Sequence, residues 1–267
     1  MNTVHTSNLW IPYRRPSNKS CLRLFCFPYA GGGASVFREW VDSFPMEIDV
    51  CPIQYPGREK RMTEAPFTLM EPLIDALVSG LQSEFNIPFA FFGHSLGALI
   101  SFELVRRLLK RGVSPIHLFI SGYRAPVIAR RKPPMHLLPD AEFVERLRDY
   151  NGTPEAVLAN SELMRVLLPT LRADFALHET YVYSPAVPLS CPISAYGGME
   201  DPEVKYKDLI LWEAQTIGNF KVHMFPGNHF YIHNNRKELA SSIIKDLTVD
   251  YRKYSNACES IYTGTWN

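Results

Sequence analysis

Residues 89–98 read FAFFGHSLGA, and this stretch decides the fold of the chain. It opens with a short run of aromatic residues, typical of a buried strand, and continues with the pattern G-x-S-x-G centred on Ser95. Helix-forming residues follow from 99 to 110. Strand, sharp turn and helix predict a nucleophile elbow, in which a strained turn projects the serine hydroxyl above the sheet. Gly93 and Gly97 are needed there, because a Cβ at either position would crowd the crossing of strand and helix.

A length of 267 residues suits a single α/β domain with an insertion, covering residues 1–267. Hydrophobic residues make up 46% of the chain and charged residues 21%, as in ordinary globular proteins. The net charge of +1 argues against a nucleic-acid binder. Because no apolar run is long enough for a membrane span and the N-terminal residues lack the apolar core of a signal peptide, we expect a cytoplasmic protein. The five cysteines show no C-x-x-C spacing, and we expect Cys26 and Cys51 to be buried thiols.

Strand-like runs alternate with helical stretches, which predicts a mainly parallel sheet with helices on both faces. The expected strands are residues 22–29, 50–54, 89–92, 117–121, 193–196 and 221–225. The expected helices between and after them are residues 34–44, 69–85, 99–110 and 237–247.

This alternation breaks between about 125 and 190. We expect several short helices there, one starting at Asp140 and another at Ser161, with Pro169 separating the latter from residues 170–183. Such an insertion before a late strand predicts a lid over the carboxyl edge of the sheet. A packing subdomain without a gating role is the alternative.

A serine hydroxyl needs a neighbouring base to become a nucleophile. On a G-x-S-x-G scaffold the acid and the histidine follow the serine in that order. His229 follows a strand-like run and lies in a Gly-Asn loop just before the last helix. His94 is a poor candidate, because neighbouring side chains at an elbow diverge. His233, one helical turn after His229, is the only serious rival.

The acid should lie in the loop after the strand at 193–196, which reads GGMEDPEV. This loop offers Glu200, Asp201 and Glu203. We assign Asp201, because the preceding glycines let the loop turn back toward the site and the following proline fixes its exit. The loop after the strand at 117–121, SGYRAP, contains no carboxylate. A cap of its own loop is the alternative role for Asp201.

An acyl-transfer site also needs two backbone N–H donors for the oxyanion. One is the amide of Leu96, directly after the serine. The other is expected from the early loop PYAGGGAS, where Ala30 lies at the turn and the glycines let the backbone approach a substrate. A phosphate cradle is the alternative for this loop, but the G-x-G-x-x-G pattern with its downstream acid is absent.

These motifs resemble the thioesterase family of α/β hydrolases, in particular the standalone type II thioesterases that accompany nonribosomal peptide and polyketide synthases. The resemblance covers nearly the full length and rests on LFCFPYAGGGASVF, IQYPGRE, FAFFGHSLGA, LFISGYRAP, LRADF, GGMEDPEV and FPGNHFYI. It implies an α/β-hydrolase fold with a helical lid. It also implies Ser95 as nucleophile, His229 as general base and Asp201 as its orienting partner. The amides of Ala30 and Leu96 would then form the oxyanion hole.

The resemblance implies a serine hydrolase that removes acyl or aminoacyl groups from the phosphopantetheine arm of carrier proteins, clearing misprimed or stalled groups. No metal is expected, and no cofactor beyond the phosphopantetheine of the partner. A thioester suits this chemistry, because a thiol with a pKa near ~8.5 leaves more readily than an alcohol or an amine. One departure from the family is Asn228, where a second glycine is usual.

Three alternatives stay open: a medium-chain fatty acyl thioesterase serving a fatty acid synthase, a general carboxylesterase, and a binding module that keeps the fold. The last would be indicated by an incomplete set of catalytic residues.

The expected partners are acyl or peptidyl carrier domains, with no nucleic acid and no membrane, and the chain is expected to be a monomer. Such carriers are typically acidic, and this chain has basic clusters at 58–61, 106–111 and 130–132. Solvated faces or helix ends are the simpler interpretation of each cluster. The cluster at 130–132 opens the lid segment and is the one to test.

Overall fold

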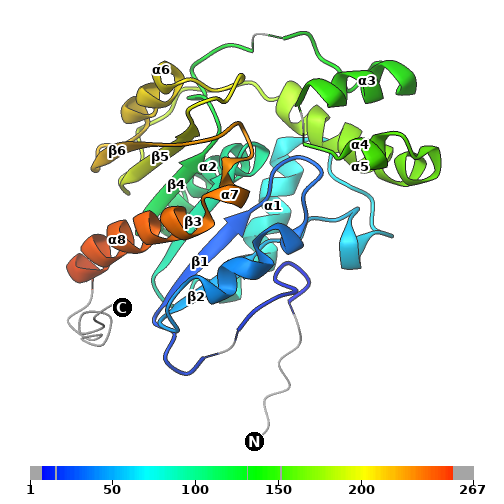
Figure 1. Ribbon diagram of the computed structural model, residues 1–267. Helices are drawn as coiled ribbons and strands as arrows, with labels where there is room; N and C mark the ends of the chain where they lie inside the picture. The colour runs from blue at the N-terminus through cyan, green and yellow to red at the C-terminus, as the bar shows by residue number, and fades with distance from the viewer. Residues whose placement is uncertain (1–7, 16, 131, 151, 255–267) are drawn as a thin grey trace, which may run out of the picture.

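A computed structural model describes residues 8–15, 17–130, 132–150 and 152–254. Its centre is a six-stranded parallel sheet in the order β2-β1-β3-β4-β5-β6 (Figure 1). The strands are β1 (Leu22–Phe27), β2 (Ile48–Pro52), β3 (Phe89–His94), β4 (His117–Ser121), β5 (Ile193–Gly198) and β6 (Phe220–Phe225). All six predicted strands are therefore confirmed, with ends that differ by a few residues.

Alternating side chains of the strands build a separate core on each face of the sheet. Phe25 and Phe27 of β1 pack on one face with α1 (Met70–Leu81) and α2 (Leu96–Leu109). Leu24 and Cys26 pack on the other face with the 3₁₀ helix η1 (Ala34–Asp42) and with α8 (Arg236–Tyr254). Both faces are covered, so the strands read as nearly continuous apolar runs. The predicted α/β fold is confirmed.

The remaining short elements connect these layers. They are η2 (Glu59–Arg61), η3 (Gln82–Glu84), α6 (Tyr206–Leu209), η4 (Ile210–Gln215) and α7 (Tyr231–Asn234). Cys26 and Cys51 are buried free thiols, as predicted. None of the helices within the described ranges combines the length and apolar character that crossing a membrane requires.

The order of the sheet fixes the place of a ligand site. The chain runs from β1 outward to β2 and then returns to place β3 on the other side of β1. Strand order thus reverses between β1 and β3, and in open parallel sheets ligands bind in the crevice at the carboxyl ends of such a pair. The glycine-rich loop after β1 and the turn after β3 both lie at this crevice.

Three helices of the inserted segment gather at the arrowhead end of the strands (Figure 1). They are α3 (Asp140–Tyr150), α4 (Glu155–Leu158) and α5 (Ser161–Glu179). They share a small apolar core of their own, which includes Phe143, Leu147 and Phe175. This core lets the segment pack as a unit above the crevice, and this segment, residues 125–190, is termed the lid.

The prediction that Pro169 separates two helices is wrong. α5 continues through Pro169 to Glu179. A proline in a helix interior costs about 3 kcal/mol, because it removes a hydrogen bond and crowds the preceding turn. Leu168 and Leu171 on either side are buried in the lid core. Burial of a side chain of this size contributes about 2 kcal/mol, so packing offsets the loss.

Candidate active site

Ser95 occupies the turn between β3 and α2, with a φ of 53° and a ψ of −119°. A positive φ is rare for a residue with a Cβ and marks a strained position. The amide of Ser95 donates to the carbonyl of Ser121 at 2.8 Å, which fixes the turn against the end of β4. The strained turn leaves the serine side chain half-buried and facing the lid side.

The two glycines of this turn have no room for a side chain. A Cβ on Gly93 would lie 2.2 Å from the carbonyl oxygen of Gly97, and a Cβ on Gly97 would lie 2.1 Å from the carbonyl oxygen of Phe27. Both distances are far inside van der Waals contact. The helix can start directly above the strand only because both positions are glycine, as predicted from the sequence.

Asp201 and His229 meet across the loops that follow β5 and β6. His229 Nδ1 lies 2.7 Å from Asp201 Oδ2, and the side chain of Asp201 is fully buried. Asp201 Oδ1 also accepts hydrogen bonds from the amides of Glu203 (2.8 Å) and Val204 (3.2 Å). Asp201 therefore caps its own loop and holds the imidazole at the same time. This leaves His229 Nε2 as the ring nitrogen not engaged by the aspartate.

The loops approach closely because of a glycine and a second carboxylate. A Cβ on Gly198 would lie 2.4 Å from the carbonyl oxygen of Asn228, so only glycine fits there. Glu200, the alternative acid, accepts from the amide of Gly227 and ties the two loops together. Asn228 Oδ1 accepts from the amide of Phe230 at 2.9 Å, a local turn bond that a glycine at this position would lack.

The other two candidate histidines have different partners. His94 is fully buried, its Nδ1 lies 2.8 Å from the Oγ of Ser121, and it is not among the residues that line the cavity. Burial, and then the neighbouring His229 and His233, hold the pKa of His94 well below its usual range, so its ring is neutral. His233 Nε2 lies 3.2 Å from the hydroxyl of Tyr29. Of the three rings, His229 is the one that meets a carboxylate at hydrogen-bond distance.

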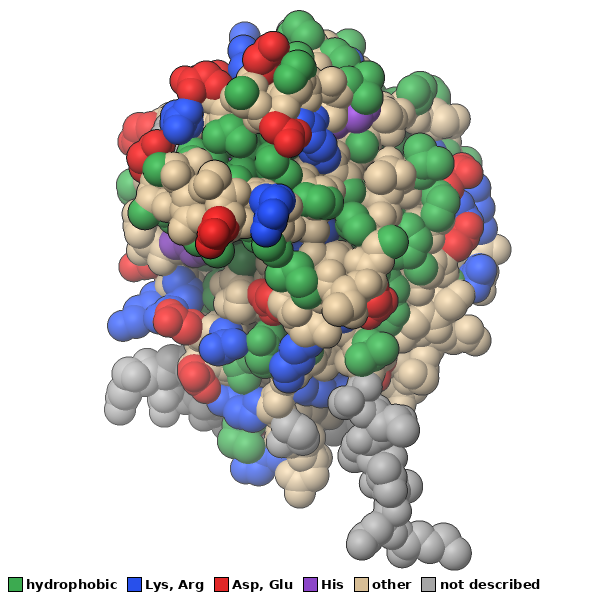
Figure 2. Space-filling view, turned by 90° about the vertical axis from the view of Figure 1, so that its right-hand side faces the viewer, with side chains coloured by type: hydrophobic (Ala, Val, Ile, Leu, Met, Phe, Trp, Pro, Cys, Tyr) green, Lys and Arg blue, Asp and Glu red, His purple; other side chains and the backbone are tan. Residues whose placement is uncertain are grey.

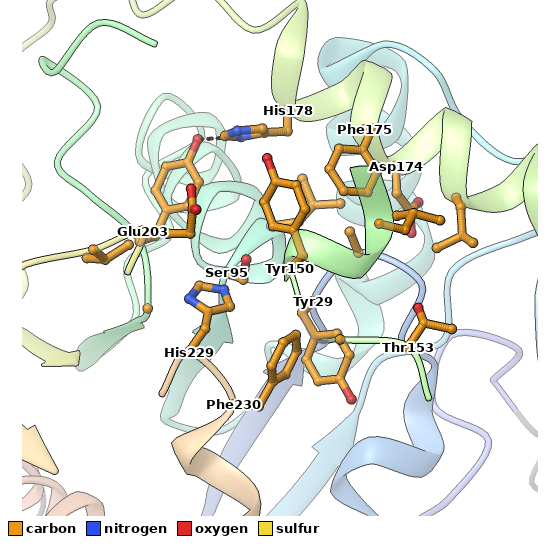
Figure 3. A pocket seen from close by; sticks show the side chains of 18 of the residues that line it. Tyr29, Ser95, Tyr150, Thr153, Asp174, Phe175, His178, Glu203, His229 and Phe230 are labelled. Atoms are coloured by element: carbon orange, nitrogen blue, oxygen red, sulfur yellow. Dashed lines mark hydrogen bonds between the residues drawn. The ribbon is translucent and has the colours of Figure 1, made fainter. Parts of the chain in front are cut away.

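Ser95, Leu96, Ala30 and His229 all line one cavity of about 100 Å³ beneath the lid. Within the described part of the chain, the amides of Ala30 and Leu96 donate to no other residue. Figure 3 shows Ser95 beside the imidazole of His229, with side chains of the lid above them. A reacting carbonyl in this cavity would have a hydroxyl, an imidazole and two free N–H donors around it.

The wall opposite Ser95 holds a polar pair that the sequence analysis did not assign. The hydroxyl of Tyr123 lies 2.9 Å from Nδ1 of His178, which comes from α5 (Figure 3). Burial lowers the pKa of His178 to about 4 and raises that of the Tyr123 hydroxyl, so both groups are neutral. Nothing in the local sequence marks this pair, because its members lie more than fifty residues apart.

Apolar side chains of the lid also line the cavity. They include Leu147 and Tyr150 of α3, together with Leu171 and Phe175 of α5. The lid thus supplies part of the site itself, in addition to covering it.

Both arginines of one basic cluster lie below the surface. Arg58 and Arg61 are buried and paired, Arg58 with Asp174 of α5 and Arg61 with Glu64. The interpretation of residues 58–61 as a basic patch is therefore wrong, because local charge density cannot show that the partner of Arg58 lies in the lid.

Comparison with known proteins places the chain among thioesterases. The thioesterase domain family model matches residues 22–247. The chain is 47% identical to the gramicidin S biosynthesis protein GrsT of Aneurinibacillus migulanus, over 92% of this chain and 97% of that protein.

Solved structures agree with this placement. The type II thioesterase BorB from the borrelidin biosynthetic cluster superposes with a TM-score of 0.83 at 37% identity, over 90% of this chain and 98% of that one. YbtT, a type II thioesterase from the yersiniabactin NRPS/PKS biosynthetic pathway, superposes with a TM-score of 0.80 at 28% identity, over 91% and 98%.

Proposed function

The chain belongs to the thioesterase family, and we propose that it hydrolyses acyl and aminoacyl thioesters on the phosphopantetheine arm of carrier proteins serving a nonribosomal peptide or polyketide synthase. Its role there is to clear misprimed or stalled groups. The observation that carries the chemistry is the contact between His229 and buried Asp201 at the cavity that holds Ser95.

In this mechanism Ser95 Oγ attacks the thioester carbonyl while His229 Nε2 accepts its proton. Asp201 keeps the other ring proton on Nδ1 and stabilises the imidazolium that forms. The negative oxygen of the tetrahedral intermediate binds the amides of Ala30 and Leu96, each worth roughly 3 kcal/mol of transition-state stabilisation.

Collapse of the intermediate breaks the C–S bond, and His229 returns the proton to the departing thiol. Water then enters, His229 takes one of its protons, and attack on the acyl-serine releases the acid and restores Ser95. No metal or further cofactor is needed for these steps.

The size of the cavity supports short acyl groups as substrates. A volume of about 100 Å³ is smaller than the ~150 Å³ cavity that accommodates benzene in a protein core. Acetyl, propionyl or a small aminoacyl group fits such a space. A decanoyl chain would extend beyond it, toward the adjoining cavity of about 430 Å³ that shares Tyr29, Ala30 and Leu171.

Docking of the carrier is proposed at the start of the lid. Lys132 pairs with Glu203 at the cavity wall, Arg130 is exposed, and Arg131 lies outside the described residues. Viewed from the side of the lid, acidic and basic side chains are interspersed (Figure 2), so the basic contribution to docking is local. An acidic carrier attracted by these groups would bind less well as salt rises.

The test is hydrolysis of a panel of carrier proteins bearing acetyl, aminoacyl and decanoyl groups, followed by mass spectrometry, with Ser95→Ala as the matched control. We expect fast loss of the short groups, slow loss of decanoyl, and rates on carrier thioesters above those on coenzyme A thioesters at low salt. Preference for decanoyl would indicate fatty acid release, and preference for free esters a carboxylesterase.

A further inference from the structure

Ala30 lies in a four-residue turn whose geometry fixes the direction of its N–H. The amide of Gly32 donates to the carbonyl of Tyr29 at 2.9 Å, and Gly31 has a φ of +79°. A four-residue turn in which the third residue has a positive φ and the second does not is a type II turn, and glycine is favoured at its third position. In such a turn the N–H of the third residue is not used by the turn itself.

The N–H of Gly31, the third residue of the turn, donates instead to the lid helix α5. Gly31 donates to Oδ2 of Asp174 at 2.7 Å, and the side chain of Asp174 is almost fully buried. Leu171, one helical turn earlier, packs so closely that a Cβ on Gly31 would lie 2.7 Å from its Cδ2. Asp174 also lines the cavity that holds Ser95 (Figure 3), as does Leu171. Helix α5 therefore rests directly on the turn that carries Ala30.

Arg58 holds the carboxylate of Asp174 in place from the opposite side. Its Nη1 lies 2.6 Å from Oδ2, and its Nη2 lies 2.7 Å from Oδ1. The same Nη1 donates to the carbonyl of Gly32 at 3.2 Å. This two-pronged geometry fixes both the position and the plane of the carboxylate. Buried ion pairs are weak evidence for stability, because desolvation opposes the attraction, so orientation is the better account of this one.

The rest of the loop has anchors of its own. Gln54 Oε1 accepts from the amide of Ala34 at 3.0 Å, and Glu59 Oε1 accepts from the amide of Ser35 at 3.2 Å. Removal of the Asp174 carboxylate therefore loosens the turn at Ala30 while the remaining loop stays attached to the segment after β2.

We propose that Asp174, held by Arg58, is a positioning residue that aims the Ala30 N–H at the developing oxyanion. The lid is then part of the transition-state site through α5. This inference rests on the proposed function for the role of Ala30 as an oxyanion donor.

The test compares Asp174→Ala and Asp174→Asn with wild type. Asparagine keeps an oxygen that can accept from Gly31 but loses the charge that pairs with Arg58. The matched control is Asp140→Asn, which breaks the ion pair of Asp140 with Arg172, another residue of α5, at a more exposed place. Each protein is assayed for kcat and KM on acetyl-carrier thioester, for melting temperature, and for both the rate and the final extent of fluorophosphonate labelling at Ser95.

We expect Asp174→Ala to lose roughly 10²-fold in kcat, the lower end of the cost of removing an oxyanion donor, with KM nearly unchanged. Its labelling should slow by a similar factor but reach the wild-type extent, Asp174→Asn should be intermediate, and Asp140→Asn should match wild type. Labelling of Asp174→Ala at the wild-type rate would overturn the proposal, and so would a loss of activity matched by an equal loss of labelled sites. If wild type is labelled but does not cleave the carrier thioester, the proposed function fails while the labelling rates still decide the positioning role.

Discussion

Asp201→Asn tests the proposed orienting role of the buried Asp201 carboxylate with the smallest change in shape. Asn Oδ1 can still accept from the amides of Glu203 and Val204, which Asp201 Oδ1 now binds. The amide group then faces His229 Nδ1, where Asp201 Oδ2 lies at 2.7 Å, and it can only donate there. The ring must place its proton on Nε2, so it cannot take the proton of Ser95.

Loss of the correct tautomer in a serine–histidine–aspartate site lowers kcat by about 10⁴-fold, or roughly 5.5 kcal/mol of transition-state stabilisation. The loop bonds remain, so the free energy of unfolding should fall by less than about 3 kcal/mol, the cost of one hydrogen bond to a charged group. Turnover on acetyl-carrier thioester and chemical denaturation give the two numbers.

The matched control is Glu200→Gln. Glu200 is the neighbouring carboxylate and bonds the amide of Gly227 instead of a histidine. This variant should keep most of its turnover. A larger loss in Glu200→Gln than in Asp201→Asn would refute the assignment of the acid, as would near-normal turnover in Asp201→Asn.

Two further predictions concern the lid. Burial lowers the pKa of His178 to about 4 in the native state. In the unfolded chain its pKa is the ordinary ~6.5, so between these two values the unfolded chain binds a proton that the native state does not. The free energy of unfolding therefore falls as pH falls, and His178 accounts for about 2 kcal/mol of this loss between pH 7 and pH 5. Chemical denaturation of His178→Gln at both pH values should show a loss that is smaller by this amount. An unchanged pH dependence would remove His178 as its source. Leu147 lines the cavity, so Leu147→Ala enlarges it. The kcat/KM for a hexanoyl carrier, divided by that for an acetyl carrier, should rise by about tenfold. A constant ratio would show that Leu147 does not limit the acyl group.

Local patterns predicted the sheet and the nucleophile turn because their causes are local. Each strand shows as an apolar run, and the crowding at Gly93 and Gly97 involves chain segments that any such crossing brings together. The loops of Asp201 and His229 were found by chain order and position. The same reasoning failed at Pro169, because buried leucines on both sides of the proline outweigh its local preference.

The residues that the sequence did not reveal depend on distant partners. Arg58 lies in a run of charges, and only the folded chain shows that it is buried against Asp174, 116 positions away. Tyr123 and His178 likewise form one polar wall from two separate segments. Spacing along the chain carries no signal for such pairs, so the lid side of the site could not be predicted.

In the proposed mechanism a carrier-bound acyl group passes through Ser95. The direct measurement mixes wild-type protein with acetyl-carrier thioester, quenches the reaction with acid within the first turnover, and locates the acetyl group by peptide mass spectrometry. We expect an acetyl group on Ser95 that disappears as hydrolysis proceeds, and none at this peptide in Ser95→Ala. An acetyl group on another residue, or hydrolysis by Ser95→Ala at the wild-type rate, would contradict this mechanism.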